Sequence, residues 1–214
     1  MRVPESNVSA IRQSLAFRNR GLLGALLLVP AAVAVLFSEP LVAEGSAAGM
    51  AMDFAGWVLF LLYATFRLWA TLYIGGKKDT ELQTRGPYSM TRNPLYFGSL
   101  CFALSAASFL KSPTLLLMVL MLGAIYSGAV IKAEERLLEG KFGDEFRHWS
   151  RVTPRLFPSR GLLGSEESVE VSIRALRKEV LRLWAAALLP FLAEVVSHLR
   201  AAPWWPHFHW LPIY

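Results

Sequence analysis

The sequence predicts an all-α, polytopic membrane protein with about five transmembrane helices and a mostly helical cytosolic segment, residues 133–178, towards its C-terminal end. Hydrophobic residues make up 54% of the 214 residues and charged residues only 18%, with a mean hydropathy of +0.39. The apolar residues also occur in long blocks rather than with the period of a soluble core. A bilayer core leaves no partner for unpaired backbone groups, so such blocks cross it as helices. We expect residues 1–214 to form a single integral membrane domain.

Five apolar segments are candidate spans. The first follows a long basic stretch and is expected to be retained as a helix, because no clear small-x-small cleavage site follows it before Glu39. The third is short, which leaves its ends or its tilt open. The predicted spans are residues 21–37, 54–74, 96–110, 114–131 and 180–199.

The third and fourth spans are expected to form an antiparallel hairpin that turns at Lys111-Ser112-Pro113. The two arms on either side of this turn have nearly equal lengths at about 1.5 Å per residue. The hairpin therefore returns Arg92 and Tyr96 to the same membrane face as Glu134 and Glu135. A guanidinium, a phenol and two carboxylates at one level predict a site for a small zwitterionic ligand at a membrane surface.

Basic residues are distributed unequally among the predicted loops. Residues 38–53 contain Glu39, Glu44 and Asp53 but no lysine or arginine. By the positive-inside rule, the N-terminus and the candidate site are cytoplasmic, at the inner membrane if the source is bacterial. Topology and anionic lipid headgroups account for the net charge of +6, and no nucleic-acid partner is expected. The cytoplasmic basic residues are Arg2, Arg12, Arg18, Arg20, Lys77, Lys78, Arg85, Arg92, Lys132, Arg136, Lys141, Arg147, Arg151, Arg155 and Arg160.

Several other chemistries are not supported by the sequence. Cys101 is the only cysteine, so neither a disulfide framework nor a cysteine zinc site is expected. His207 and His209 lie among tryptophans, a pattern more typical of an aromatic interfacial tail than of a metal site. No glycine-rich turn joins a strand to a helix, which argues against a dinucleotide or phosphate loop. We therefore expect no metal.

The residues at the start of the third span have specific local roles. Asn93 is expected to cap the helix with its side-chain oxygen, and Pro94 fits the first helical position. Arg92 then stands beside a helix N-terminus whose free N–H groups favour an anion. Tyr96 adds a hydroxyl one turn into the helix, and Gly98 allows another helix or a ligand to approach closely. Taken alone, Arg92 could instead snorkel to lipid phosphates and Tyr96 could belong to the interfacial aromatic belt.

Glu134 and Glu135 point about 100° apart on a helix, so they are expected to have different partners. Acidic residues at the positively charged end of a span need an explanation, such as binding a cation or pairing with arginine. The simpler alternative is a solvated pair with Lys132 or Arg136.

Five ordered blocks resemble the signature of the isoprenylcysteine carboxyl methyltransferase and phospholipid methyltransferase superfamily. The resemblance covers about residues 84–158 and implies a membrane methyltransferase that uses S-adenosylmethionine. It further implies that the cofactor lies between the membrane helices and the cytosolic segment, and that a lipophilic acceptor arrives laterally from the lipids of the bilayer. The blocks are GPY at residues 86–88, TRNPLYFG at 91–98, Glu134-Glu135 with Leu138, FGDEF at 142–146 and TPRLFP at 153–158.

The resemblance also implies roles for individual residues. Arg92, or the helix end behind it, would hold the methionine carboxylate of the cofactor, and Glu134 or Glu135 its amino group. Arg155, which could close a cytosolic lid or orient an acidic acceptor, and Glu135 are the candidate catalytic residues. The candidate cofactor-binding residues are Tyr88, Arg92, Asn93, Pro94, Tyr96, Gly98, Glu134 and Glu135.

The chain departs from the superfamily pattern at two places. Asn93 stands where members that modify prenylated cysteine usually have histidine, so the prenylcysteine substrate does not transfer directly. Residues 179–214 form an additional apolar helix and an aromatic tail beyond the signature. Arg182 and Glu194 in this helix are about 18 Å apart, so each needs another partner.

Two other classes of protein remain open. Membrane sterol and steroid reductases share an arginine-histidine-proline-x-tyrosine helix start and would use reduced nicotinamide, but Glu134-Glu135 and residues 142–158 favour the methyltransferase. A non-catalytic membrane scaffold would need the same residues only for anchoring. Arg67, near the end of the second span, is expected to snorkel. The acceptor is undefined among prenylated thiols, phospholipid amines, volatile thiols and polyketide-like hydroxyls.

Overall fold

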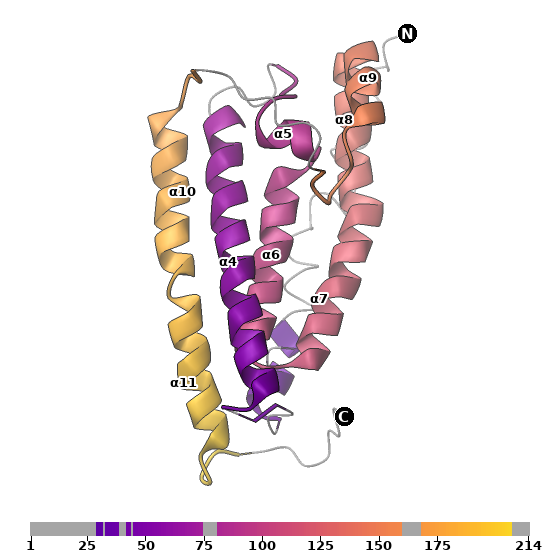
Figure 1. Ribbon diagram of the computed structural model, residues 1–214. Helices are drawn as coiled ribbons and strands as arrows, with labels where there is room; N and C mark the ends of the chain where they lie inside the picture. The colour runs from indigo at the N-terminus through magenta and orange to yellow at the C-terminus, as the bar shows by residue number, and fades with distance from the viewer. Residues whose placement is uncertain are drawn as a thin grey trace.

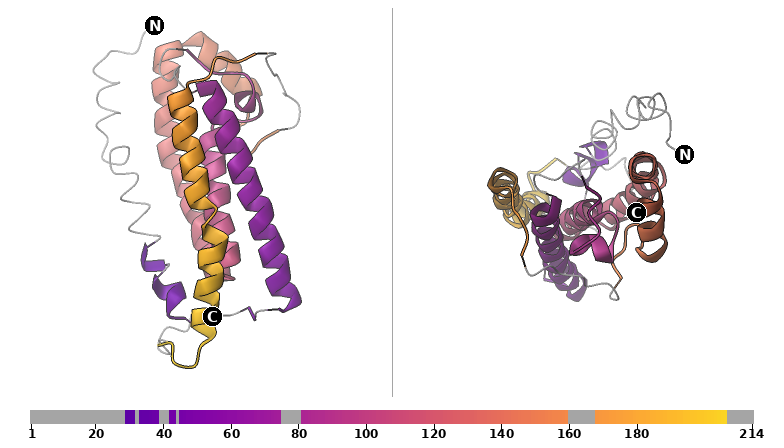
Figure 2. Two further views of the ribbon diagram at one scale, coloured as in Figure 1. Left: turned by 90° about the vertical axis from the view of Figure 1, so that its left-hand side faces the viewer. Right: turned by 90° about the horizontal axis from the view of Figure 1, so that it is seen from above.

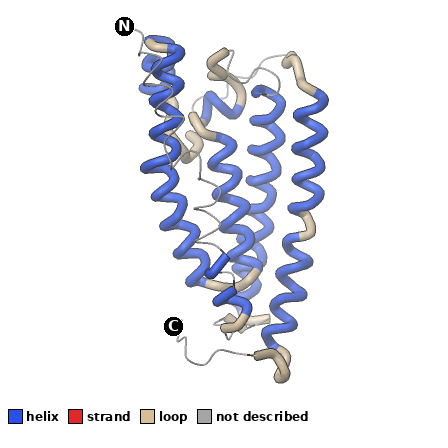
Figure 3. Tube along the Cα trace, turned by 180° about the vertical axis from the view of Figure 1, so that it is seen from behind, coloured by secondary structure: helices blue, strands red, loops and turns tan. Residues whose placement is uncertain are grey.

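The computed structural model describes residues 29–31, 33–38, 42–43, 45–74, 81–159 and 168–206. Every regular element within these residues is a helix, and they contain no strand (Figure 3). The all-α prediction is confirmed. Of the first predicted span, only its C-terminal part, helical at 29–31 and 33–36, falls within the described residues.

Three helices are long and apolar enough to cross a membrane, and they run alongside one another in one bundle (Figure 1). They are Ala47–Ile74, Pro113–Phe142 and Ile173–Arg200, with the shorter apolar helix Pro94–Phe109 packed between them (Figure 2). The chain is therefore a helical membrane protein. The predicted number of five spans is not confirmed by these helices.

The centre of the bundle is the pair of helices α4 (Ala47–Ile74) and α6 (Pro94–Phe109). Small residues bring their backbones together: a Cβ on Gly56 would lie 2.9 Å from the Phe109 ring, and Ser105 Oγ donates to the Gly56 carbonyl at 2.8 Å. The C-terminal helices pack on this pair, α10 against α4 and α11 against α6.

The hairpin turn lies where the sequence predicts it. Lys111 adopts a positive φ of 48°, which reverses the chain direction. Ser112 then caps the next helix, because its Oγ accepts from the Leu115 N–H at 3.2 Å, and Pro113 occupies the first turn. These local signals are why the two arms form as neighbours.

The second arm of the hairpin is longer than the predicted fourth span. Helix α7 (Pro113–Tyr126) continues through a π-helical turn, Ser127–Ile131, into α8 (Lys132–Phe142). One continuous helix therefore carries Glu134 and Glu135 beyond the apolar stretch. A π-turn widens the helix locally and is frequent beside functional sites. Gly143, with φ of 57°, ends α8 and allows α9 (Asp144–Val152) to turn back.

The helix that contains the last predicted span begins before that span. Ser172 caps α10 (Ile173–Ala186), which leads into α11 (Leu189–Ala201) with Pro190 in its first turn. The polar residues 173–178 therefore belong to the same helix as the start of the predicted span 180–199. Within the predicted cytosolic segment, the described residues are helical in α8, α9 and the start of α10, whereas residues 153–159 and 168–172 are irregular.

Candidate functional site

The candidate site lies at the end of the bundle where α5 (Pro87–Met90), the start of α6, α8 and α9 meet (Figure 1). Gly86 precedes α5 with φ of 57°, and a Cβ there would collide with the Tyr73 ring. Only glycine allows this turn to pack against α4. Tyr88 follows and is buried with Tyr73, Ala70 and Trp149, whose indole N–H donates to the Tyr88 carbonyl at 3.2 Å.

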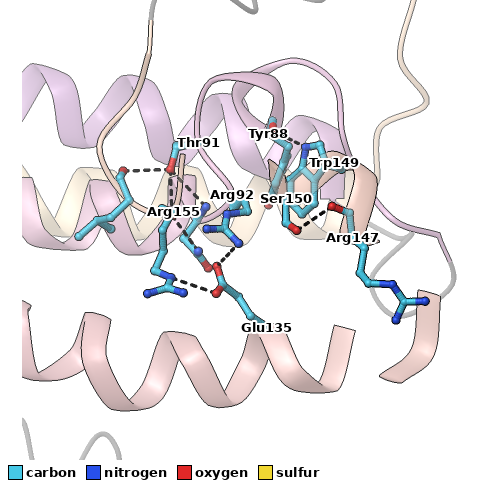
Figure 4. A network of polar contacts seen from close by, with 10 residues as sticks. Tyr88, Thr91, Arg92, Glu135, Arg147, Trp149, Ser150 and Arg155 are labelled. Atoms are coloured by element: carbon cyan, nitrogen blue, oxygen red, sulfur yellow. Dashed lines mark hydrogen bonds and ion pairs between the residues drawn. The ribbon is translucent and has the colours of Figure 1, made fainter. Parts of the chain in front are cut away.

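Glu135 joins three segments of the chain at this end. Its Oε1 lies 3.0 Å from Arg92 Nη1, and its Oε2 accepts from Arg155 Nε at 3.0 Å (Figure 4). Glu135 and Arg92 are largely buried, whereas the Arg155 side chain is 36% exposed. The bridge therefore connects α8, the start of α6 and the segment 153–159, with Arg155 on its open side.

The segment 153–159 is docked onto the start of α6 by polar contacts. Thr91 Oγ1 donates towards the Leu156 carbonyl at 2.9 Å, with the Arg155 carbonyl at 3.2 Å, and Asn93 Nδ2 donates to the Arg155 carbonyl at 2.9 Å. Two backbone hydrogen bonds join the same segments. The Arg92 N–H donates to the Pro154 carbonyl at 2.9 Å, and the Ser159 N–H donates to the Met90 carbonyl at 3.1 Å. The signature blocks at 91–98 and 153–158 are thus one structural unit.

The predicted capping role of Asn93 is wrong. Asn93 has φ of −130° and ψ of 58°, and its side chain makes no capping hydrogen bond. Its side-chain amide instead donates to the Arg155 carbonyl, 62 residues away in the sequence. Pro94 does occupy the first turn of α6, as predicted.

Glu134 and Glu135 diverge as their spacing predicts. Tyr96 Oη donates to Glu134 Oε2 at 2.8 Å. This hydrogen bond is a second polar contact to α8, beside the ion pair of Arg92 with Glu135. Glu135 pairs with Arg92 and Arg155 rather than with Lys132 or Arg136. Arg92, Tyr96, Glu134 and Glu135 are therefore brought together at this end of the bundle, whereas Gly98 lies against the Arg67 side chain of α4.

Three buried polar atoms at this end of the bundle lack a hydrogen-bond partner within the part of the chain that the structure describes: Tyr88 Oη, Arg92 Nε and Glu135 Oε1. Glu135 Oε1 is close enough to Arg92 for an ion pair, but the contact does not have hydrogen-bond geometry. Such atoms are rare in proteins because leaving them unpaired costs about 1–3 kcal/mol each.

Burial shifts the pKa values of two of these groups. Desolvation raises the pKa of Tyr88 strongly, Glu134 raises it further, and Arg67 opposes the shift. Tyr88 is therefore a neutral hydrogen-bonding group. Desolvation lowers the pKa of Arg92. The negative charge of Glu135 opposes this shift, and the positive charge of Arg155 adds to it.

A second ion cluster was not predicted. Arg67 contacts Glu179 twice, Nε to Oε1 at 2.6 Å and Nη2 to Oε2 at 3.0 Å, and Arg182 Nη1 reaches Glu179 Oε2 at 3.0 Å. Arg67 therefore does not simply snorkel, and the partner of Arg182 is Glu179. The only sequence signal was the i, i+3 spacing of Glu179 and Arg182 on one helix.

No group of three or more metal-ligating side chains gathers within the described ranges. His207 and His209 lie outside them. The clusters that the structure does place are ion pairs between arginine and carboxylate.

Comparison with known proteins agrees with a membrane methyltransferase. The profile of the phospholipid methyltransferase family matches residues 45–145, from α4 to the start of α9. The nickel-cobalt-cadmium resistance protein NccN of Alcaligenes xylosoxydans xylosoxydans is 35% identical over 147 residues, 68% of either chain. The cobalt-zinc-cadmium resistance protein CzcN of Cupriavidus metallidurans is 34% identical over 114 residues, 53% of this chain and 52% of the relative. No solved structure matches the chain significantly.

The fold and the site thus define an integral membrane protein with a polar cluster at one end of a helical bundle. The chain belongs to the phospholipid methyltransferase family, within the isoprenylcysteine carboxyl methyltransferase-like superfamily of membrane methyltransferases.

Proposed function

We propose that the protein is a membrane methyltransferase that uses S-adenosylmethionine and acts on a lipophilic acceptor. The observation that carries this proposal is that buried polar atoms of Tyr88, Arg92 and Glu135, all inside the family's signature region, have no hydrogen-bond partner among the described residues. A scaffold would gain stability by pairing or removing these atoms. Their retention favours a ligand-binding site.

The residues present fit the zwitterionic end of the cofactor. Arg92 Nε and the start of α6 would receive the carboxylate, and Glu134 the ammonium group. Tyr88 and Tyr96 would line the pocket, with Asn93, Pro94 and Gly98 shaping its wall. When bound, the cofactor supplies an electrophilic methyl group on a sulfonium sulfur.

The chain's own contribution would be positioning and exclusion of water. Glu135 is committed to two guanidinium groups, so we assign it to holding Arg92 and Arg155 in place rather than to proton transfer. Arg155 lies on the open side of the cluster and would orient the acceptor. A carboxylate or thiolate acceptor needs no base, whereas an amine or phenol must lose a proton.

The apolar outer surface supports an acceptor that approaches within the bilayer. Large hydrophobic side chains on α4, α7 and the last two helices point away from the bundle, as expected for residues that contact lipid. A lipophilic acceptor would concentrate beside them. These residues include Phe54, Trp57, Leu61, Leu117, Leu120, Met121, Ile125, Leu181, Trp184, Phe191 and Leu192.

We further infer that the site faces the cytoplasm, in the inner membrane of a bacterium, because basic residues are concentrated at this end. Arg151→Cys in a Cys101→Ser background would place a single reactive thiol on α9, which is exposed there. Protection of this thiol from an impermeant maleimide in intact cells, and labelling after permeabilisation, is expected. Labelling in intact cells would contradict the proposed orientation and place the site on the outer face of the membrane.

The relatives' names suggest a setting for the activity. Both relatives are named for metal resistance. One name refers to nickel, cobalt and cadmium, and the other refers to cobalt, zinc and cadmium. We infer that methyl transfer by this protein contributes to tolerance of such metals. Deletion should lower growth under metal stress, and the Glu135→Gln variant should fail to restore it. Full restoration by that variant would separate tolerance from the site.

Calorimetry with detergent-purified protein tests the proposed cofactor. S-adenosylmethionine and a reduced nicotinamide are titrated in parallel, with Arg92→Ala, Glu134→Gln and Glu135→Gln as variants and the exposed Arg147→Gln as a matched control. Saturable S-adenosylmethionine binding that the site variants weaken and the control retains is the expected result. Nicotinamide binding alone would indicate a reductase, and binding of neither by folded protein would favour a scaffold.

A further inference from the structure

The ion cluster between α4 and α10 is unusually well buried on its acidic side. The Glu179 side chain is only 4% exposed and is held by Arg67 from α4, while the third member, Arg182, is 63% exposed. Burying a carboxylate costs several kcal/mol, and an ion pair only partly offsets this cost. A buried ion pair is therefore weak evidence for stability alone, and ionisable groups inside membrane bundles frequently serve function.

The Arg67 side chain lies against Gly98, the last residue of the signature block at 91–98. A Cβ on Gly98 would lie 3.0 Å from Arg67 Cγ and 3.2 Å from Arg67 Cδ. The missing side chain at Gly98 thus allows the Arg67 stem to lie against α6, one turn beyond Pro94. The close approach that the sequence predicts at Gly98 is made by this arginine.

The same face of α4 borders Tyr88. Ala70, three residues after Arg67 and on the same helix face, is fully buried and belongs to the same hydrophobic cluster as Tyr88. Desolvation raises the pKa of Tyr88 most, Glu134 raises it further, and Arg67 opposes the shift. The Tyr88 hydroxyl, which has no hydrogen-bond partner among the described residues, therefore lies between the influence of an anionic group on α8 and that of a cationic group on α4.

Glu179 fixes the direction of the Arg67 guanidinium. It engages Nε and Nη2 in a two-point contact, the geometry that leaves least freedom to an arginine head. We propose that Glu179 is a positioning residue of the ligand site: it holds Arg67 as a second cationic group beside Tyr88, where Arg67 receives the anionic part of a zwitterionic ligand whose cationic part Glu134 attracts. This inference rests on the proposed binding of S-adenosylmethionine.

The proposal gives a role to the C-terminal helix. Residues 173–201 lie outside the range matched by the family profile, which ends at residue 145. Through Glu179, this helix becomes part of the site rather than an additional membrane anchor.

A paired replacement separates a positioning role from a structural one. Arg67→Met with Glu179→Met removes both charges together and leaves no unpaired charge behind, a change that buried ion pairs frequently tolerate. The readouts are the thermal midpoint without ligand and the affinity for S-adenosylhomocysteine by calorimetry. Arg182→Gln is the matched control, because it removes the exposed arginine from the same carboxylate.

We expect the double variant to keep a cooperative thermal transition and to bind S-adenosylhomocysteine about tenfold more weakly or worse, with Arg182→Gln close to wild type. Equal affinity of the folded double variant and wild type would overturn the proposal. If the double variant does not fold, Glu179→Asp, which keeps both charges and displaces Arg67, should weaken binding while preserving the fold; unchanged affinity would again overturn it. Absence of binding by folded wild-type protein would overturn the proposed cofactor and this inference together.

Discussion

The two ends of the bundle both bury charged side chains, but they satisfy them differently. At the hairpin-turn end, Arg200 donates to the Leu110 carbonyl at 3.1 Å and the Ser38 carbonyl at 3.2 Å, and buried Lys111 pairs with Asp53 at 3.2 Å. At the opposite end, Tyr88 Oη, Arg92 Nε and Glu135 Oε1 are buried without hydrogen-bond partners among the described residues. Charge at the first end closes the structure, whereas the unpaired atoms at the second end are those that the proposed function assigns to a ligand.

The helix ends explain this difference. Arg200 binds the carbonyl at the C-terminal end of α6, where free acceptors and the helix dipole favour a cation. The opposite end of α6 receives no side-chain cap, since Asn93 is engaged elsewhere. An anion is the natural partner for that end. The following predictions test whether stability and binding are divided between the two ends in this way.

The largest expected effect is that of Glu135→Gln. It leaves Arg92 and Arg155 without their shared carboxylate, and we expect a loss of about 2–3 kcal/mol in the free energy of unfolding, less than for a fully buried pair because Arg155 is 36% exposed. S-adenosylhomocysteine affinity should fall about 100-fold or more. Calorimetry and thermal unfolding measure both. Wild-type affinity in this variant would remove Glu135 from the site.

Arg200→Met should lower the stability of the protein without lowering its affinity for the ligand. Loss of charged donors to the Leu110 and Ser38 carbonyls should reduce the free energy of unfolding by about 1.5–3 kcal/mol. Ligand affinity, measured by calorimetry below the new transition temperature, should stay at the wild-type value. A parallel loss of affinity would show that the ends are not separable.

Tyr96→Phe tests a single contact at the site end. It removes the 2.8 Å hydrogen bond to Glu134 without changing shape, and we expect about 1 kcal/mol of stability to be lost. Glu134 would then be less well oriented, so ligand affinity should fall about tenfold. An unchanged affinity would indicate that Glu134 does not contact the ligand.

The smallest effect is expected for Thr91→Val, which is nearly isosteric. It removes the hydroxyl that holds the Leu156 and Arg155 carbonyls, at a cost of about 0.5–1.5 kcal/mol. Hydrogen exchange should accelerate within residues 153–159, while the turn at Lys111 keeps its protection. Uniform acceleration at both ends would mean that the segment is not independently docked.

Local signals in the sequence predicted the elements of the site well. Proline at the helix starts, the turn at Lys111-Ser112-Pro113 and the equal arms of the hairpin bring Tyr96 to Glu134, because these features act within a few residues. The partner of Asn93 could not be predicted in this way, since the Arg155 carbonyl comes from a segment whose docking depends on the whole fold. The bond between Arg67 and Glu179 spans 112 residues, and spacing within either helix does not reveal which helices are adjacent.

The helix that contains the last predicted span begins before that span. Residues 173–178 carry Arg174, Arg177 and Lys178, which indicate a polar connector. In the bundle they form the start of α10, with their side chains exposed at the same end as the candidate site, while Glu179 turns inward. The charged residues and the apolar stretch that follows them are therefore parts of one helix.

The central claim is that the unpaired polar atoms at the site end are kept for a ligand, and Tyr88→Phe tests it most directly. This variant removes a buried hydroxyl that has no hydrogen-bond partner among the described residues, so the ligand-free protein should unfold at a higher temperature than wild type. Saturating S-adenosylhomocysteine should then stabilise the variant less than it stabilises wild type. A variant that is no more stable alone, or that gains as much from the ligand as wild type does, would contradict the account.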